Sequence, residues 1–137
     1  MENSEIKIAF LGGGFGGVAK EKLETAGFTL VDLGNKEVDL IVVASYGKIL
    51  PKEMLKIPKY GALNAHPSLL PKYRGPAPVP TTILNGEKET GVTIILMDEQ
   101  VDHGPIMASK KFSLFARSPE GREIRNSKLT TPELSKT

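Results

Sequence analysis

Two polar side chains with the chemistry of acyl transfer stand two positions apart in this sequence. Asn64 and His66 lie at the end of a short apolar segment, residues 62–65, that is typical of a β-strand. Residues two apart on a strand point to the same side. An amide N–H and an imidazole N–H that face one small space could both donate to a carbonyl oxygen as it becomes tetrahedral. The structural alternative is that Asn64 satisfies backbone groups at the strand end and His66 caps the loop.

A third participant could come from the carboxylates Asp98, Glu99 and Asp102, which follow a later apolar run. A carboxylate beside His66 would fix the orientation of the imidazole and allow proton exchange with an attacking amine. The sequence alone does not choose among the three. The two histidines of the chain, His66 and His103, have no regular spacing, so the case for a metal site is weak and we predict none.

Apolar runs and glycine and proline signals predict the elements that must position these residues. Strands are expected over residues 6–11, 28–33, 39–45, 62–65, 91–97 and 105–112, and helices from the glycine cluster to Ala26, over 51–57 and up to Leu84. The strand over 39–45 is continuously apolar, as in strands buried on both faces. The order of elements up to about residue 85 predicts an α/β, Rossmann-like, mostly parallel sheet with flanking helices, whose final strand pair could be antiparallel.

The glycine cluster after the first strand suggests a competing function. Gly12, Gly14 and Gly17 satisfy the pattern G-x-G-x-x-G, and Asp32 ends the next strand, where a ribose-binding acid would lie in a dinucleotide site. Five glycines in six positions satisfy almost any glycine motif, however. We therefore favour a tight strand-to-helix turn and keep a nucleotide-binding module as the alternative.

Length and composition indicate one ordinary globular domain. The chain has 137 residues, of which 39% are hydrophobic and 25% charged, with a net charge of +2 and no cysteine. Its N-terminus does not resemble a signal peptide, and no apolar run is long enough to span a bilayer, so we expect a cytoplasmic protein with no membrane partner. We expect residues 1–112 to form the catalytic domain and 113–137 a basic, flexible or truncated tail, in which Thr131 and Pro132 mark a helix start.

Residues 62–106 (ALNAHPSLLPKYRGPAPVPTTILNGEKETGVTIILMDEQVDHGPI) resemble the folate-dependent formyltransferase family, and the match extends over roughly 39–112. The motifs Asn-x-His, Ser-Leu-Leu-Pro, Tyr-Arg-Gly, Thr-Gly-Val-Thr and Val-Asp-x-Gly-Pro recur in the family's order. The resemblance implies a formyltransferase-type fold and a catalytic set of Asn64, His66 and Asp102. It also implies that 10-formyltetrahydrofolate is the donor, that no metal is needed, and that the donor is held by Ser68, Leu69, Leu70, Pro71, Tyr46, Lys48, Ile49 and Leu50.

The acceptor implied by the resemblance is the amino group of methionyl-tRNA, which would connect one-carbon metabolism to protein biosynthesis. Arg74 matches an arginine of the tRNA-directed branch and could bind an acceptor phosphate. The chain is abbreviated relative to that branch, both between Leu11 and Asp39 and after the last strands. A small amine such as glycinamide ribonucleotide or an amino sugar nucleotide is therefore an alternative acceptor, and a non-catalytic folate-binding module an alternative function. The abbreviated sheet would leave edges that a second copy could cover.

Overall fold

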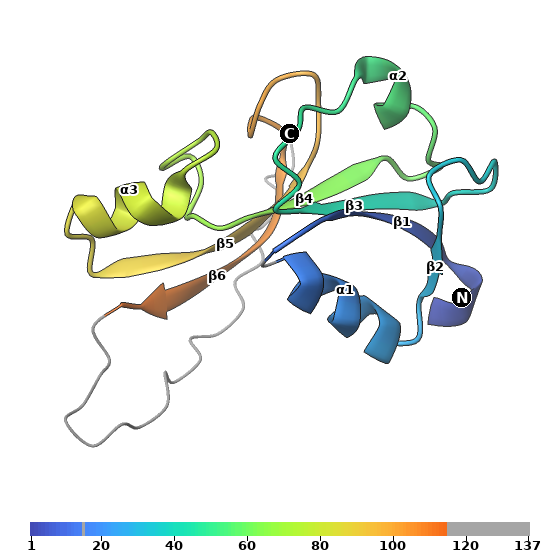
Figure 1. The fold of residues 1–137 in the computed structure, drawn as a ribbon, viewed down its shortest axis with the longest axis horizontal. Helices are drawn as coiled ribbons and strands as arrows, with labels where there is room; N and C mark the ends of the chain where they lie inside the picture. Colours follow the sequence, from blue (N-terminus) through green and yellow to red (C-terminus); the bar gives the residue numbers. More distant parts are fainter. Residues whose placement is uncertain (15, 115–137) are drawn as a thin grey trace, which may run out of the picture.

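The computed structural model describes residues 1–14 and 16–114, which form one six-stranded sheet in the order β2-β1-β3-β4-β5-β6 (Figure 1). The pairs β1–β2, β1–β3 and β3–β4 are parallel, whereas β4–β5 and β5–β6 are antiparallel. This confirms the predicted Rossmann-like α/β sheet and its antiparallel end. The strands are β1 (Lys7–Gly12), β2 (Thr29–Val31), β3 (Leu40–Ala44), β4 (Ala62–His66), β5 (Glu89–Leu96) and β6 (Ile106–Ser113).

The helices are short and lie on both sides of the sheet. They are η1 (Asn3–Glu5), α1 (Gly16–Thr25), α2 (Lys52–Leu55) and α3 (Pro78–Leu84). Figure 1 shows α1 and α2 on opposite sides of the parallel strands, and α3 beside β5 and β6. Pro78 occupies the first turn of α3, where its fixed φ suits the helix and its missing N–H costs nothing. The three predicted helices are all present, with slightly different limits.

The glycines of the first turn allow two backbones to approach closely. A Cβ atom at Gly12 would lie 2.0 Å from the carbonyl oxygen of Ala44, and one at Gly16 would lie 2.1 Å from the same atom. The turn and the start of α1 therefore pack directly against the end of β3. This packing accounts for two of the glycines without a nucleotide, and it supports the interpretation of the cluster as a tight turn.

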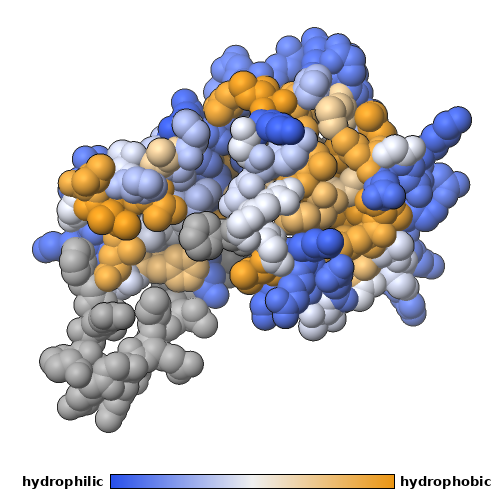
Figure 2. Space-filling model, viewed as in Figure 1, coloured by the Kyte–Doolittle hydropathy of each residue, from blue (hydrophilic) through white to orange (hydrophobic). Residues whose placement is uncertain are grey.

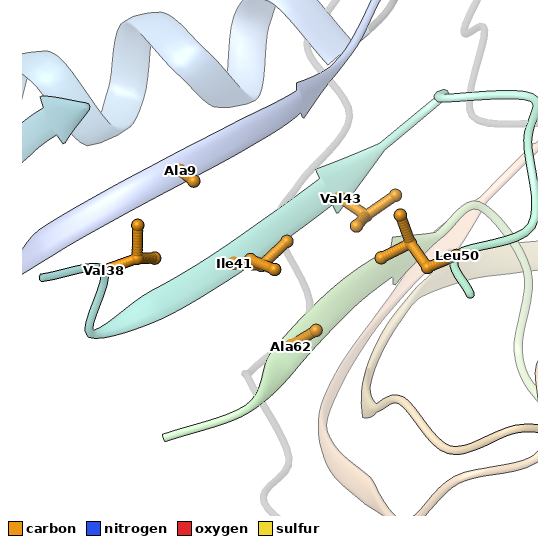
Figure 3. Packing of buried hydrophobic residues seen from close by; sticks show 6 residues of the cluster. All are labelled: Ala9, Val38, Ile41, Val43, Leu50 and Ala62. Atoms are coloured by element: carbon orange, nitrogen blue, oxygen red, sulfur yellow. The ribbon is translucent and has the colours of Figure 1, made fainter. Parts of the chain in front are cut away.

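The buried core lies on the α2 side of the parallel strands. Ile41 and Val43 of β3 contact neighbours from β1, β4 and the loops at both ends of β3. Figure 3 shows how these side chains converge, with Val43 pointing toward Leu50. The six buried members are Ala9, Val38, Ile41, Val43, Leu50 and Ala62. This cluster forms the base on which the functional loops rest.

The expectation that residues 39–45 are buried on both faces is wrong for one face. Leu40 and Val42 are only half-buried, and they line an apolar groove with Leu23, Phe28 and Leu63. The reason is the short connection from β2 to β3, which contains no helix in the described structure, so α1 covers this side of the sheet incompletely. Figure 2 shows hydrophobic residues gathered over the β1 and β3 part of the molecule and again over α3.

The tail predicted from residue 113 onward is described only at Ser113 and Leu114. The helix start expected at Thr131 lies outside the described residues. None of the helices described is long and apolar enough to cross a membrane.

Candidate active site

A pocket of about 410 Å³ opens at the carboxyl ends of β3 and β4. Ligands generally bind at this edge of an open α/β sheet, near the point where the strand order reverses. Here the order reverses between β1 and β3, next to the pocket. The loop after β3, residues 45–50, forms one wall, and the loop after β5, residues 98–102, forms the other. Val43, Ile95 and Met97 supply an apolar floor, whereas Asn64, His66 and Asp102 supply polar groups.

Strand β4 places Asn64 and His66 on the pocket side of the sheet. Both residues line the pocket, whereas Leu63, the preceding residue of β4, lines the apolar groove. Asn64 is flanked by Val43 of β3 and Ile95 of β5, so both neighbours of this amide are apolar. The period-two pattern of β4 therefore brings the amide and the imidazole into one space, as the sequence predicted.

The structure places Asp102, rather than Asp98 or Glu99, beside this pair. Its Oδ1 atom lies 3.4 Å from Asn64 Nδ2 and 3.4 Å from His66 Nδ1. Its Oδ2 atom accepts a hydrogen bond of 2.7 Å from the backbone N–H of Gly75. The carboxylate is only 8% exposed, so these donors replace most of its hydration.

The other two carboxylates have different partners. Asp98 Oδ2 lies 2.7 Å from His103 Nδ1, and its Oδ1 accepts the backbone N–H of Gln100. The hydrogen bond from His103 is the main reason that the pKa of Asp98 lies below its usual value, and the bond from Gln100 adds to it. Glu99 pairs with Lys52 of α2 at 2.6 Å. Asp102 is thus the carboxylate available to His66.

The orientation of the His66 ring is fixed by a backbone carbonyl. His66 Nε2 lies 2.8 Å from the carbonyl oxygen of Tyr73. A carbonyl oxygen can only accept, so Nε2 must carry the proton of this hydrogen bond. The other ring nitrogen, Nδ1, faces Asp102. With His66 only 5% exposed, the ring is held between two acceptors and cannot turn without losing a hydrogen bond.

Backbone strain is concentrated around the pocket. The three non-glycine residues with positive φ in the described structure are Ser45 at 53°, Tyr73 at 58° and Asp102 at 50°. Ser45 and Asp102 line the pocket, and the Tyr73 carbonyl binds His66. Such conformations are unfavourable for residues with a side chain and persist where surrounding contacts enforce them, which is common at functional sites.

The residues predicted to bind the donor divide into two groups. Tyr46, Lys48, Ile49 and Leu50 all line the pocket. The segment 68–71 does not belong to its lining. Instead the buried Ser68 hydroxyl donates to the Lys72 carbonyl, and Thr93 Oγ1 donates to the Ser68 carbonyl at 2.6 Å while accepting the Leu70 N–H at 3.1 Å.

The two hydrogen bonds of Thr93 attach this segment, which follows β4, to β5. Contacts of the formyl donor with this segment are therefore not supported by the pocket lining and stay a prediction for Ser68, Leu69, Leu70 and Pro71. Arg74 is exposed and also outside the pocket lining, so its contact with an acceptor stays a prediction as well.

Sequence reasoning missed two backbone groups that complete the site. The Tyr73 carbonyl and the Gly75 N–H bind His66 and Asp102 respectively, and backbone groups carry no signal in residue type. The positive φ of Gly75, 99°, is the one local hint, because glycine adopts this region without steric cost. Within residues 1–14 and 16–114, no three His, Asp or Glu side chains are grouped to hold a metal ion.

The sequence pattern of the formyl transferase family matches residues 22–131 of this chain. The protein therefore belongs to the formyl transferase family. A methionyl-tRNA formyltransferase of Wolbachia pipientis subsp. Culex pipiens is 61% identical over 79 residues, which cover 58% of this chain and 26% of that protein. The chain thus spans about a quarter of the length of that relative.

Two solved structures share the fold. A phosphoribosylglycinamide formyltransferase from Bacillus halodurans superposes with a TM-score of 0.65 at 22% identity, over 82% of each chain. The formyltransferase PseJ from Anoxybacillus kamchatkensis, solved with a formamido sugar nucleotide and tetrahydrofolate, superposes with a TM-score of 0.64 at 25% identity. That match covers 80% of this chain and 61% of PseJ.

Proposed function

We propose that this protein transfers a formyl group from 10-formyltetrahydrofolate to an amine. The observation that carries the proposal is the contact of Asp102 with both Asn64 and His66 at the polar end of an apolar pocket. This arrangement supplies hydrogen-bond donors for an oxyanion and a group that can exchange a proton, which are the two requirements of acyl transfer to an amine.

The pocket suits the donor in size and polarity. Its volume of about 410 Å³ lies in the range of small-molecule sites, which are mostly apolar with a few placed polar groups. A flat pterin ring would pack on Val43, Ile95 and Met97, with Tyr46 and Leu50 along one wall. PseJ binds tetrahydrofolate, which supports the same class of donor here.

In the proposed reaction the donor supplies an activated formyl carbon. The amine lone pair forms a bond to that carbon, the carbon's bond to the donor nitrogen breaks, and one proton passes from the amine to the leaving nitrogen. The Asn64 amide N–H and protonated His66 stabilise the oxyanion. Because Nε2 is engaged by Tyr73, Nδ1 is the nitrogen that exchanges the proton, and Asp102 stabilises His66 while it is charged.

The acceptor that we favour is the amino group of initiator methionyl-tRNA. The Wolbachia relative is a methionyl-tRNA formyltransferase, and the exposed Arg74 directly precedes Gly75 of the pocket lining, where a guanidinium could bind an acceptor phosphate. A small amine is the second candidate, because the two structural neighbours are named for a ribonucleotide substrate and a sugar nucleotide.

An assay of formyl transfer tests the function. The purified chain is titrated with tetrahydrofolate and then supplied with 10-formyltetrahydrofolate and methionyl-tRNA, glycinamide ribonucleotide or an amino sugar nucleotide. We expect transfer to methionyl-tRNA that is lost in the Asn64→Ala/His66→Ala variant. Folate binding without transfer to any of the three would indicate a non-catalytic folate-binding module, and no folate binding would refute the proposal.

We also propose that residues 1–112 are the catalytic part of a cytoplasmic protein that can self-associate. The supporting observation is that β2 and β6 are the outermost strands of the described sheet, and unpaired strand edges can pair with another chain. Sedimentation analysis at increasing protein concentration tests the association. A constant monomer mass would contradict it.

A further inference from the structure

We propose that Tyr73 and Glu87 are positioning residues for His66: their side chains hold the Tyr73 carbonyl where it fixes the imidazole. The inference rests on the proposed function of His66 in formyl transfer. Neither Tyr73 nor Glu87 lines the pocket, so neither is expected to touch a substrate. Their effect on the reaction passes through the groups that this loop holds, the ring of His66 and its partner Asp102.

The clamp consists of four side chains from two segments. The Tyr73 hydroxyl donates to Glu87 Oε1 at 2.6 Å and accepts from Asn85 Nδ2 at 3.1 Å. Lys72 Nζ donates to the same oxygen of Glu87 at 3.2 Å. These contacts attach the loop after β4 to the turn between α3 and β5. Hydrogen bonds to a charged acceptor are the stronger kind.

The charge of Glu87 supports the strength of this clamp. The hydrogen bond from the Tyr73 hydroxyl, followed by the bond and the charge of Lys72, holds the pKa of Glu87 below its usual value. Glu87 is therefore ionised at neutral pH. Its side chain remains partly shielded, at 28% exposure, which limits competition from water.

The backbone of Tyr73 needs such a clamp. Its φ of 58° lies in the left-handed region, which an aromatic residue seldom adopts without enforcement. In this conformation the side chain points toward Glu87 while the carbonyl of the same residue points to His66 Nε2. Release of the side chain would let the backbone relax toward ordinary φ values. The carbonyl would then move away from the ring.

The neighbouring residues of the loop would carry the same movement to Asp102. The Gly75 N–H, two residues after Tyr73, donates to Asp102 Oδ2. The clamp therefore influences both groups that face the His66 ring: the Tyr73 carbonyl at Nε2 and the Asp102 carboxylate at Nδ1.

Nuclear magnetic resonance of the imidazole tests the proposal directly. The chain has only two histidines, His66 and His103, so a His103→Gln variant assigns the His66 signals. The Nε2 proton of His66 should be observable and protected, because it is buried and donated to a carbonyl. In Tyr73→Phe and Glu87→Ala we expect its exchange with water to accelerate by about tenfold or more, the scale of losing a hydrogen bond to a charged group.

Two further variants make the result specific. Glu87→Gln keeps an oxygen that can accept from the Tyr73 hydroxyl but loses the charge, so its exchange should lie between that of the wild type and that of Glu87→Ala. Tyr60→Phe removes the hydroxyl of an exposed tyrosine outside the pocket lining, and it should change nothing. Wild-type exchange of the Nε2 proton in either folded Tyr73→Phe or folded Glu87→Ala would overturn the proposal.

Activity then separates positioning from general structural support. Tyr73→Phe should lower kcat by between about 10-fold and 100-fold, the range expected for a small misplacement of a reacting group. KM for the donor should stay within about twofold, because the pocket walls are unchanged. Equal loss in kcat and in donor affinity would contradict positioning. If wild type and variants all lack transfer, the proposed function fails, yet the exchange measurement still decides whether Tyr73 and Glu87 hold His66.

Discussion

Asp102 differs from the two other carboxylates of its loop in what it contacts. Its oxygens face Asn64, His66 and Gly75, whereas Asp98 is paired with His103. Asp102→Asn keeps the volume but removes the charge, so formyl transfer should fall by about 10²- to 10⁴-fold, the usual contribution of acid–base partners. Asp98→Asn in the same loop is the matched control: Asp98 also lines the pocket but is paired with His103 rather than His66, so its loss of activity should be much smaller. Comparable losses in both variants would contradict the assignment.

Gly104 is the residue that lets the Asp102 loop close onto the sheet. A Cβ at this position would lie 1.6 Å from the carbonyl oxygen of Leu96, and backbone at a strand end cannot move away easily. Gly104→Ala should therefore lower the free energy of unfolding by about 1–3 kcal/mol, as overpacking does. Urea denaturation measures this. Gly13→Ala, where nothing lies within 4 Å, should be close to neutral, and an equal effect at both positions would refute the explanation.

At the scale of elements, one buried hydroxyl attaches the loop after β4 to β5. Thr93 Oγ1 donates to the Ser68 carbonyl and accepts the Leu70 N–H. Thr93→Val keeps the shape but leaves both backbone groups without their partner, which should cost about 1–3 kcal/mol for each buried group left unsatisfied. Thr90→Val on the same strand is the control. We expect urea denaturation to show a clear loss for the first variant and little change for the second.

The strands were predictable from sequence because apolar runs bounded by glycine and proline carry a local signal. Which faces of the sheet the helices cover was not predictable in the same way. The continuous apolar run of β3 indicated two buried faces, yet Leu40 and Val42 line an apolar groove, because burial depends on whether another element happens to pack there. The connection from β2 to β3 contains no helix among the described residues, and this could not be read from β3 itself.

The candidate site was predictable to the extent that side chains define it. The two-residue spacing of Asn64 and His66 on a strand required them to share a face. The choice of Asp102 over Asp98 and Glu99 depended on how a loop folds back, which residue types do not determine. The contributions of the Tyr73 carbonyl and the Gly75 N–H come from the backbone, so only the fold reveals them.

At the scale of the whole molecule, three carboxylates make contacts that stabilise the fold. Two of these contacts join segments that are distant in sequence, and the third lies within the loop after β5. Glu37 pairs with Lys7 at the start of β1, Glu87 with Tyr73, and Asp98 with His103. Each of these contacts is the largest cause of a pKa below the usual value of its acid. The three acids therefore favour the folded state only while they are ionised.

The sign of the resulting pH dependence follows from the lowered pKa values. Stability from these acids is fully present above the unfolded values, 4.5 for the two glutamates and 3.8 for Asp98. It is lost as pH falls through the lower folded values, because the unfolded chain then binds more protons. The contribution of these acids to the free energy of unfolding should thus be nearly constant from pH 7 to 5 and decrease below about pH 4.5.

Urea denaturation of the wild type and of Glu37→Gln/Asp98→Asn across this pH range measures the effect. The double variant lacks two of the three acids, so its free energy of unfolding should decrease less steeply below pH 4.5. The difference between the two proteins should therefore shrink as the pH falls. Because these groups are exposed, 1 M salt should reduce the difference at neutral pH as well. Parallel curves at all pH values would mean that these contacts do not contribute to folding, and that apolar packing of β1, β3 and β4 alone joins the segments.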